Sequence, residues 1–101
     1  MSSGVYGVSK GAVESLMRSE AEAWGGRGVT SNTLVPGFVL TPLNARLQDD
    51  PEQISALAAR TMIGRNGLPS DFASAAVFLA SAGSAYVTGH SLFVDGGLSV
   101  H

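Results

Sequence analysis

A β-branched run at residues 29–35, ended by Pro36 and Gly37, constrains the fold of this chain more than any other feature. Its Val and Thr residues predict a strand, and the Pro-Gly pair predicts that the carboxyl end of this strand opens into a loop. In open α/β sheets, ligands bind just outside the carboxyl ends of the strands. The loop is therefore a candidate binding site, in which Gly37 would let the backbone approach a ligand closely. An ordinary turn is the alternative interpretation.

Helical patterns surround this strand. Residues 5–24 carry apolar side chains at helical spacing, and the glycines from Gly25 onward predict the end of that helix. These glycines follow a helix and precede a strand, which is the wrong order for a nucleotide-binding turn. A second helix is predicted at residues 51–61, with Asp50 as its cap and Pro51 at its first helical position.

The carboxyl-terminal third predicts one more helix and one more strand. Pro69 and Asp71 mark the start of a helix that ends near Gly83. Its apolar residues predict that it is well buried: Phe72, Ala76, Val77, Leu79 and Ala80. Residues 91–95 predict a short final strand. Arg65, in the loop at residues 64–68, is interpreted as a structural arginine rather than an anion-binding one.

Tyr6 and Lys10 lie four residues apart in the first predicted helix, so their side chains can point into one site. A tyrosine has a pKa of about 10, and one positive charge about 4 Å away interacts with it by up to ~4 kcal/mol, an upper bound of roughly three pKa units. Tyr6 would then exchange a proton near neutral pH, as a general acid or base does. A core tyrosine beside a solvated lysine is the alternative.

Composition excludes several classes of function. With 101 residues, of which 45% are hydrophobic, the chain is expected to form one domain with a modest core. Its net charge of −2 and scattered basic residues predict no nucleic-acid partner. The absence of cysteine and of an apolar leader or spanning segment predicts a cytoplasmic protein with no membrane association. Neither His90 nor His101 has a partner at ligand spacing, so no metal site is expected.

Four motifs follow one another in the order of a known family: residues 6–10 (YGVSK), 29–41 (VTSNTLVPGFVLT), 64–69 (GRNGLP) and 87–97 (VTGHSLFVDGG). Together they resemble the carboxyl-terminal part of a short-chain dehydrogenase/reductase, over nearly the whole chain. The resemblance implies an α/β fold, the carboxyl-terminal portion of a Rossmann-like doubly wound parallel sheet. Residues 1–101 would form a single partial domain with three or four helices and two short parallel strands. The amino-terminal nucleotide-binding half would be missing.

The resemblance also assigns roles to particular residues. Tyr6 would be the catalytic general acid or base, and Lys10 would lower its pKa and bind the nicotinamide ribose. The residues expected to frame the nicotinamide of NAD or NADP are Pro36, Gly37, Val39 and Thr41. Residues 40–63 would form a lid over the substrate. Its apolar side chains either line a substrate pocket or simply pack the helix onto the body: Leu40, Leu43, Leu47, Leu57 and Met62.

The expected function is therefore the carboxyl-terminal half of an NAD(P)-dependent short-chain oxidoreductase that interconverts a small-molecule carbonyl and alcohol by hydride transfer. The chain alone is not expected to turn over, because the Gly-rich pyrophosphate turn and the family's catalytic Ser and Asn are missing. The alternative is a catalytically inactive orphan half that acts as an oligomeric interaction module. Two strands alone are marginal. We therefore expect a homo-oligomer, joined through the edge at residues 29–35 or the first helix, or a complementing amino-terminal half.

Overall fold

The computed structural model describes residues 3–40 and 50–100, with side chains from residue 9 onward. The chain divides into two compact units. Unit 1 holds residues 1–33 and 78–92, and unit 2 holds residues 34–77 and 93–101. Within the described ranges, no helix combines the length and the apolar composition that crossing a bilayer requires.

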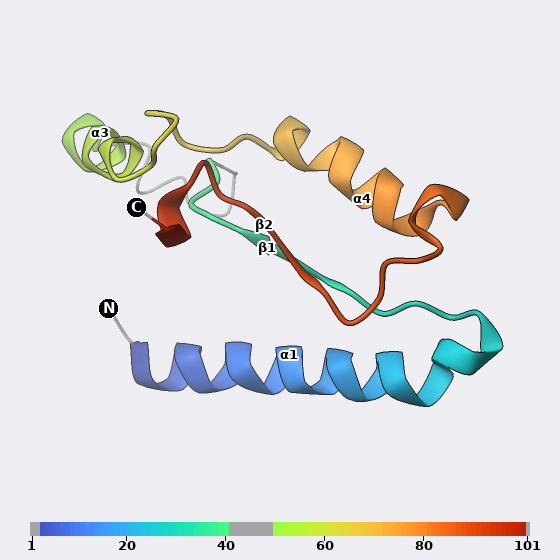
Figure 1. Ribbon diagram of the computed structural model, residues 1–101. Helices are drawn as coiled ribbons and strands as arrows, with labels where there is room; N and C mark the ends of the chain where they lie inside the picture. Colours follow the sequence, from blue (N-terminus) through green and yellow to red (C-terminus); the bar gives the residue numbers. More distant parts are fainter. Residues whose placement is uncertain (1–2, 41–49, 101) are drawn as a thin grey trace. The chain divides into compact units, whose positions relative to one another are not determined.

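Helix α1, Ser3–Trp24, is a single helix of 22 residues (Figure 1). It ends where the sequence predicts, because the glycines after Trp24 form one 3₁₀ turn, Gly25–Arg27, and Gly28 then takes a left-handed conformation with φ of 79°. Met17 and Ala21 are buried, with exposed fractions of 4% and 8%. Since these positions are four apart, one stripe of α1 packs against the rest of unit 1.

Strands β1, Thr33–Pro36, and β2, Ser91–Val94, form a two-stranded sheet and lie side by side in Figure 1. The sheet is parallel, as expected. The prediction that the first strand begins at residue 29 is wrong. The side chain of Asn32 donates a hydrogen bond to the carbonyl of Val87 (3.0 Å) and accepts one from the N–H of His90 (3.1 Å). Side-chain bonding therefore replaces the strand ladder just before β1 begins.

Helix α3, Pro51–Ala59, follows its predicted start. The Asp50 side chain accepts a hydrogen bond from the N–H of Gln53 at 3.2 Å, and Pro51 occupies the first turn. The helix ends two residues earlier than predicted. There the Thr61 hydroxyl donates to the carbonyl of Ala58 at 2.8 Å and accepts from the N–H of Gly64 at 2.8 Å.

Helix α4, Ala73–Ala80, follows a 3₁₀ turn, Pro69–Phe72, so the third predicted helix exists. The prediction that it is well buried is wrong. None of its residues is buried, and Val77 and Phe78 are 68% and 45% exposed. An all-apolar composition predicts burial only where other elements cover the helix on every side, and within the described residues nothing covers α4 in that way.

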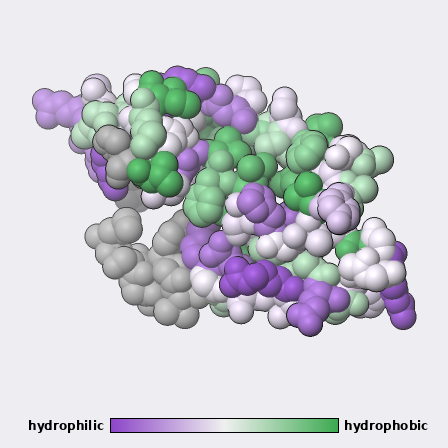
Figure 2. Space-filling view, in the orientation of Figure 1, coloured by the Kyte–Doolittle hydropathy of each residue, from purple (hydrophilic) through white to green (hydrophobic). Residues whose placement is uncertain are grey.

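Few apolar side chains are buried in the described part of the chain. Met17 and Ala21 are the buried apolar residues there, beside the polar residues Thr61, Asn66 and Ser84. Figure 2 shows apolar residues, in green, gathered in patches at the surface. Large apolar side chains exposed by more than half include Val13, Leu16, Ile63 and Val77. Exposed apolar patches are a common feature of surfaces that associate with other protein.

Candidate functional site

The two predicted catalytic residues lie on one uninterrupted helix. Tyr6 and Lys10 both belong to α1, so one helical turn separates them. For Tyr6 the structure describes the backbone. The side chain of Lys10 is half-buried, and so is that of Glu14, one turn further on. Lys10 therefore lies on the inward stripe of α1 that also carries Met17 and Ala21.

The predicted nicotinamide loop begins where β1 ends. Pro36 is the last residue of β1 and is exposed, and the N–H of Gly37 donates to the carbonyl of Val94 at 3.3 Å. A Cβ atom on Gly37 would lie 2.9 Å from the Cβ and 3.0 Å from the Cα of Asp95. Gly37 thus lies close to Asp95, directly after β2, and a larger residue would not fit there. The sequence pattern did not reveal this structural reason for a glycine at position 37.

Beyond Gly37 the chain continues as a paired, extended segment. Val39 forms an isolated parallel bridge with Gly67. The N–H of Gly67 donates to the carbonyl of Phe38 (2.9 Å), and the N–H of Leu40 donates to the carbonyl of Gly67 (3.0 Å). These bonds hold Val39 in a fixed backbone position in unit 2. Thr41, the last residue of the predicted nicotinamide frame, lies outside the described residues.

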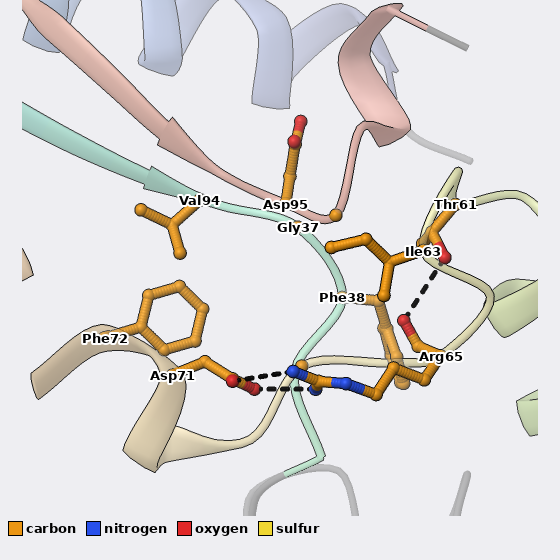
Figure 3. Close-up of a pocket in the computed structure, with 11 residues that line it drawn as sticks. Gly37, Phe38, Thr61, Ile63, Arg65, Asp71, Phe72, Val94 and Asp95 are labelled. Carbon is orange, nitrogen blue, oxygen red and sulfur yellow. Dashed lines mark hydrogen bonds and ion pairs between the residues drawn. The ribbon is translucent and has the colours of Figure 1, made fainter.

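A cavity of about 130 Å³ opens at the carboxyl ends of the two strands in unit 2 (Figure 3). This is the sheet edge at which α/β proteins bind ligands. Glycine backbone, apolar side chains and four polar side chains, three of them charged, line it: Gly37, Phe38, Thr61, Ile63, Arg65, Gly67, Asp71, Phe72, Val94, Asp95 and Gly96.

The three charged groups that line this cavity are already engaged. The Arg65 guanidinium binds the Asp71 carboxylate through two hydrogen bonds of 2.9 Å, drawn as dashed lines in Figure 3. This contact, with a further hydrogen bond from the N–H of Leu68, lowers the pKa of Asp71 to about 2. Hydrogen bonds from Ser99, and then from the N–H of Gly97, hold the pKa of Asp95 below its usual range. Arg65 is therefore a structural arginine, as interpreted from the sequence.

The apolar residues of the predicted lid were expected either to line a substrate pocket or to pack the helix. Leu40, Leu57 and Met62 do not line this cavity, while Leu43 and Leu47 lie outside the described residues. Phe38 and Asp95 line it and carry no signal of their own in the sequence. The Gly-Gly pair after Asp95 was a usable signal, since both glycines have positive φ and form the turn that brings the end of β2 there. Among the described side chains, no group of three potential ligands could hold a metal ion.

Comparison with known proteins places this chain in a family. A family profile described as "Enoyl-(Acyl carrier protein) reductase" matches residues 1–99. The galactitol 2-dehydrogenase (L-tagatose-forming) of Cereibacter sphaeroides is 47% identical over 95 residues, which are 94% of this chain and 37% of that protein. The L-rhamnose 1-dehydrogenase (NAD(P)(+)) of Sphingomonas sp. is 46% identical over 96 residues, 95% of this chain and 38% of the relative.

Solved structures agree with these relatives. A gluconate 5-dehydrogenase from Burkholderia cenocepacia, in complex with NADP and tartrate, superimposes with a TM-score of 0.90 at 42% identity, over 97% of this chain and 38% of that one. A short-chain type dehydrogenase/reductase from Mycobacterium ulcerans gives 0.89 at 38% identity, over 97% of this chain and 36% of that one. The chain thus spans just over a third of the length of the relatives it matches. It belongs to the short-chain dehydrogenase/reductase family, and its α/β fold corresponds to part of that family's Rossmann-like domain.

Proposed function

We propose that these residues are the carboxyl-terminal part of an NAD(P)-dependent oxidoreductase that interconverts a carbonyl and an alcohol by hydride transfer. The observation that carries the proposal is the position of Tyr6 and Lys10, one turn apart in an unbroken helix, with Lys10 on its inward stripe. The relatives support it, since those compared above are named as dehydrogenases of galactitol, L-rhamnose and gluconate. Substrates of the alditol, sugar or sugar-acid class are therefore the first to test.

The residues of this chain fit the nicotinamide end of such a cofactor. Lys10 offers three N–H donors, which suit ribose hydroxyl groups. Pro36 and Gly37 follow the carboxyl end of β1, and the contact of Gly37 with Asp95 fixes the loop backbone. The remaining residues proposed to frame the nicotinamide are Val39 and Thr41. When bound, the cofactor supplies or accepts the hydride.

Tyr6 moves the proton in this proposal. In the reductive direction, its hydroxyl group protonates the carbonyl oxygen as the hydride reaches the carbonyl carbon. In the oxidative direction, its phenolate accepts the proton of the substrate hydroxyl. The positive charge of Lys10 favours the phenolate and so lowers the pKa of Tyr6 toward neutrality. Matching this pKa to the working pH makes proton transfer efficient in both directions.

The chain offers a matched pair of variants for the test, because it holds two tyrosines. Tyr86 is fully exposed, with a relative accessibility of 103%, so Tyr86→Phe makes the same chemical change outside the proposed site. The intact mass of the natively expressed protein first identifies the length of chain in which the variants are made. NAD(P)H absorbance is then followed with alditols, sugars and sugar acids.

We expect Tyr6→Phe to lower kcat by about 10² to 10⁴, the usual contribution of a general acid or base, while Tyr86→Phe leaves it unchanged. A Tyr6→Phe variant with the activity of the unmodified protein would remove the role given to Tyr6. Failure of the protein to bind either nicotinamide cofactor in a fluorescence titration would favour the inactive interaction module instead.

We also propose that further protein covers the apolar surface of this region. Val13 and Leu16 of α1 are 53% and 61% exposed, and Val77 of α4 is 68% exposed. The relatives are much longer, which supports a complementing amino-terminal half as the partner, in the same chain or in a separate one. A second copy of the chain is the other partner that these surfaces would accept.

A further inference from the structure

The inward stripe of α1 carries a polar contact that links it to β2. At 3.6 residues per turn, Lys10, Glu14, Met17 and Ala21 fall within an arc of about 60° on one side of the helix. Met17 and Ala21 are buried, and Lys10 and Glu14 are half-buried. The carboxyl-terminal half of α1 therefore packs through the apolar residues Met17 and Ala21. The half that contains Tyr6 has the charged residues Lys10 and Glu14 on the same stripe.

Glu14 receives a short hydrogen bond from the opposite side of this interface. The hydroxyl group of Ser91, the first residue of β2, donates to Oε2 of Glu14 at 2.7 Å, across 77 residues of sequence. This distance is the usual one for a well-formed hydrogen bond from a hydroxyl group to an oxygen atom. Both side chains are half-buried, so water competes with the bond less than it would at an open surface.

A second contact on the same stripe shows that α1 lies close to the segment before β2. A Cβ atom on Gly89 would lie 3.8 Å from the Cβ of Ala21, which is ordinary van der Waals distance. Ala21 lies two turns after Glu14. The interface is therefore fixed by apolar packing near the carboxyl end of α1 and by the Glu14–Ser91 bond near its middle.

Apolar packing alone leaves the rotation of a helix about its own axis loosely determined, whereas a short directional hydrogen bond allows little rotation. One residue of register changes the direction of a helical side chain by about 100°. Glu14 is one turn from Lys10 and two turns from Tyr6, so rotation at Glu14 is passed directly to both. We propose that Glu14 and Ser91 are positioning residues, whose hydrogen bond sets the rotation of α1 and thereby aims Lys10 and Tyr6. This inference rests on the function proposed above.

The hydrogen bond, rather than the charge alone, is the positioning device. Glu14→Gln keeps a carbonyl oxygen of the same reach that still accepts from Ser91. Glu14→Ala and Ser91→Ala each remove the bond. Because misplacement by about 1 Å costs up to 10² in rate, we expect each of these two variants to lower kcat about tenfold, and the double variant to be no slower than the slower single one. Glu14→Gln should stay within about threefold of the unmodified protein.

Matched controls come from the outward side of the same helix. Ser19 and Glu20 are exposed, so Ser19→Ala and Glu20→Ala repeat the same chemical changes away from the stripe. Both should leave kcat and KM unchanged. Should Ser91→Ala lower the folded fraction, Ser91→Cys keeps nearly the same shape with a much weaker donor, and kcat per folded molecule is compared.

A second readout does not depend on activity. Lys10 is the only lysine among these 101 residues, so acylation of Lys10 by an amine-specific reagent is assigned without interference from another lysine of this region. Peptide mass mapping then gives the acylation rate at Lys10 relative to the amino terminus. We expect this ratio to rise in Glu14→Ala and Ser91→Ala, because Lys10 would leave its half-buried position, and to stay unchanged in Glu14→Gln, Ser19→Ala and Glu20→Ala.

The outcomes separate this inference from the proposed function. If Tyr6→Phe abolishes activity while Glu14→Ala and Ser91→Ala keep the unmodified kcat and Lys10 acylation ratio, the positioning role is overturned and the function stands. If both variants lose thermal stability but keep kcat per folded molecule, the bond is structural and the inference is wrong. If Tyr6→Phe is fully active, the proposed function fails first, and the Lys10 acylation ratio still reports whether Glu14 orients Lys10.

Discussion

Replacing Gly37 by alanine tests the contact that fixes the proposed nicotinamide loop. The new Cβ would lie 2.9 Å from the Cβ and 3.0 Å from the Cα of Asp95. Carbon atoms in contact normally lie about 3.5 to 4.0 Å apart, so the ends of β1 and β2 must separate by about 0.5 to 1 Å. Both Asp95 atoms are close to the backbone. The strain therefore cannot be relieved by turning a flexible side chain.

The expected cost follows from two opposing terms. Overpacking of this kind usually destabilises a protein by about 1 to 3 kcal/mol. Gly37 has no positive φ, so alanine also gains about 0.4 to 1 kcal/mol from the reduced entropy of the unfolded chain. We expect a net loss of about 1 to 2 kcal/mol in the free energy of unfolding. With a urea slope of about 2 kcal/mol per molar, the unfolding midpoint falls by about 0.5 to 1 M.

Gly11 provides the control with the opposite sign. It lies within α1, and a Cβ atom placed there meets nothing within 4 Å. Gly11→Ala should therefore stabilise the protein by about 0.5 to 1 kcal/mol, as alanine usually does in a helix. Urea unfolding of both variants is followed by circular dichroism. If Gly37→Ala is as stable as Gly11→Ala, the close approach of Asp95 does not exist and the reasoning about the loop is refuted.

Three further predictions concern stability and association. Asp50→Ala removes the cap of α3 and should cost about 1 kcal/mol, seen as faster amide hydrogen exchange in α3, whereas Asp50→Asn should cost little. The pKa of Asp71 is lowered from 3.8 to about 2, so its contribution to stability is complete above about pH 4 and is lost as the pH falls toward 2. Asp71→Asn should reduce the change of the urea unfolding midpoint between these two pH values. If the midpoint of the variant depends on pH as that of the unmodified protein does, the ion pair is contradicted. Light scattering of this chain alone at micromolar concentration should show association, which Leu16→Glu weakens; a compact monomer would contradict the exposed apolar surface.

The sequence predicts the helices well because their signals are local. The glycines from Gly25 onward end α1, and Asp50 with Pro51 starts α3, since capping depends on residues within one turn of each other. The strand start at Thr33 was not predictable in the same way. It is set by the hydrogen bonds of the Asn32 side chain with a segment more than 50 residues later in the chain.

The candidate site shows the same limit more sharply. The spacing of Tyr6 and Lys10 is visible in the sequence because a helix makes residues four apart neighbours. Glu14 continues that spacing, but its significance depends on Ser91, which lies 77 residues away and carries no motif of its own. Gly37 was recognised as a close approach, but the group that approaches it is Asp95 at the end of β2. In each unit, then, a residue in β2 or directly after it contacts a predicted functional element. Because these contacts join distant parts of the sequence, only the folded structure identifies Ser91 and Asp95 as neighbours of the residues proposed for the site.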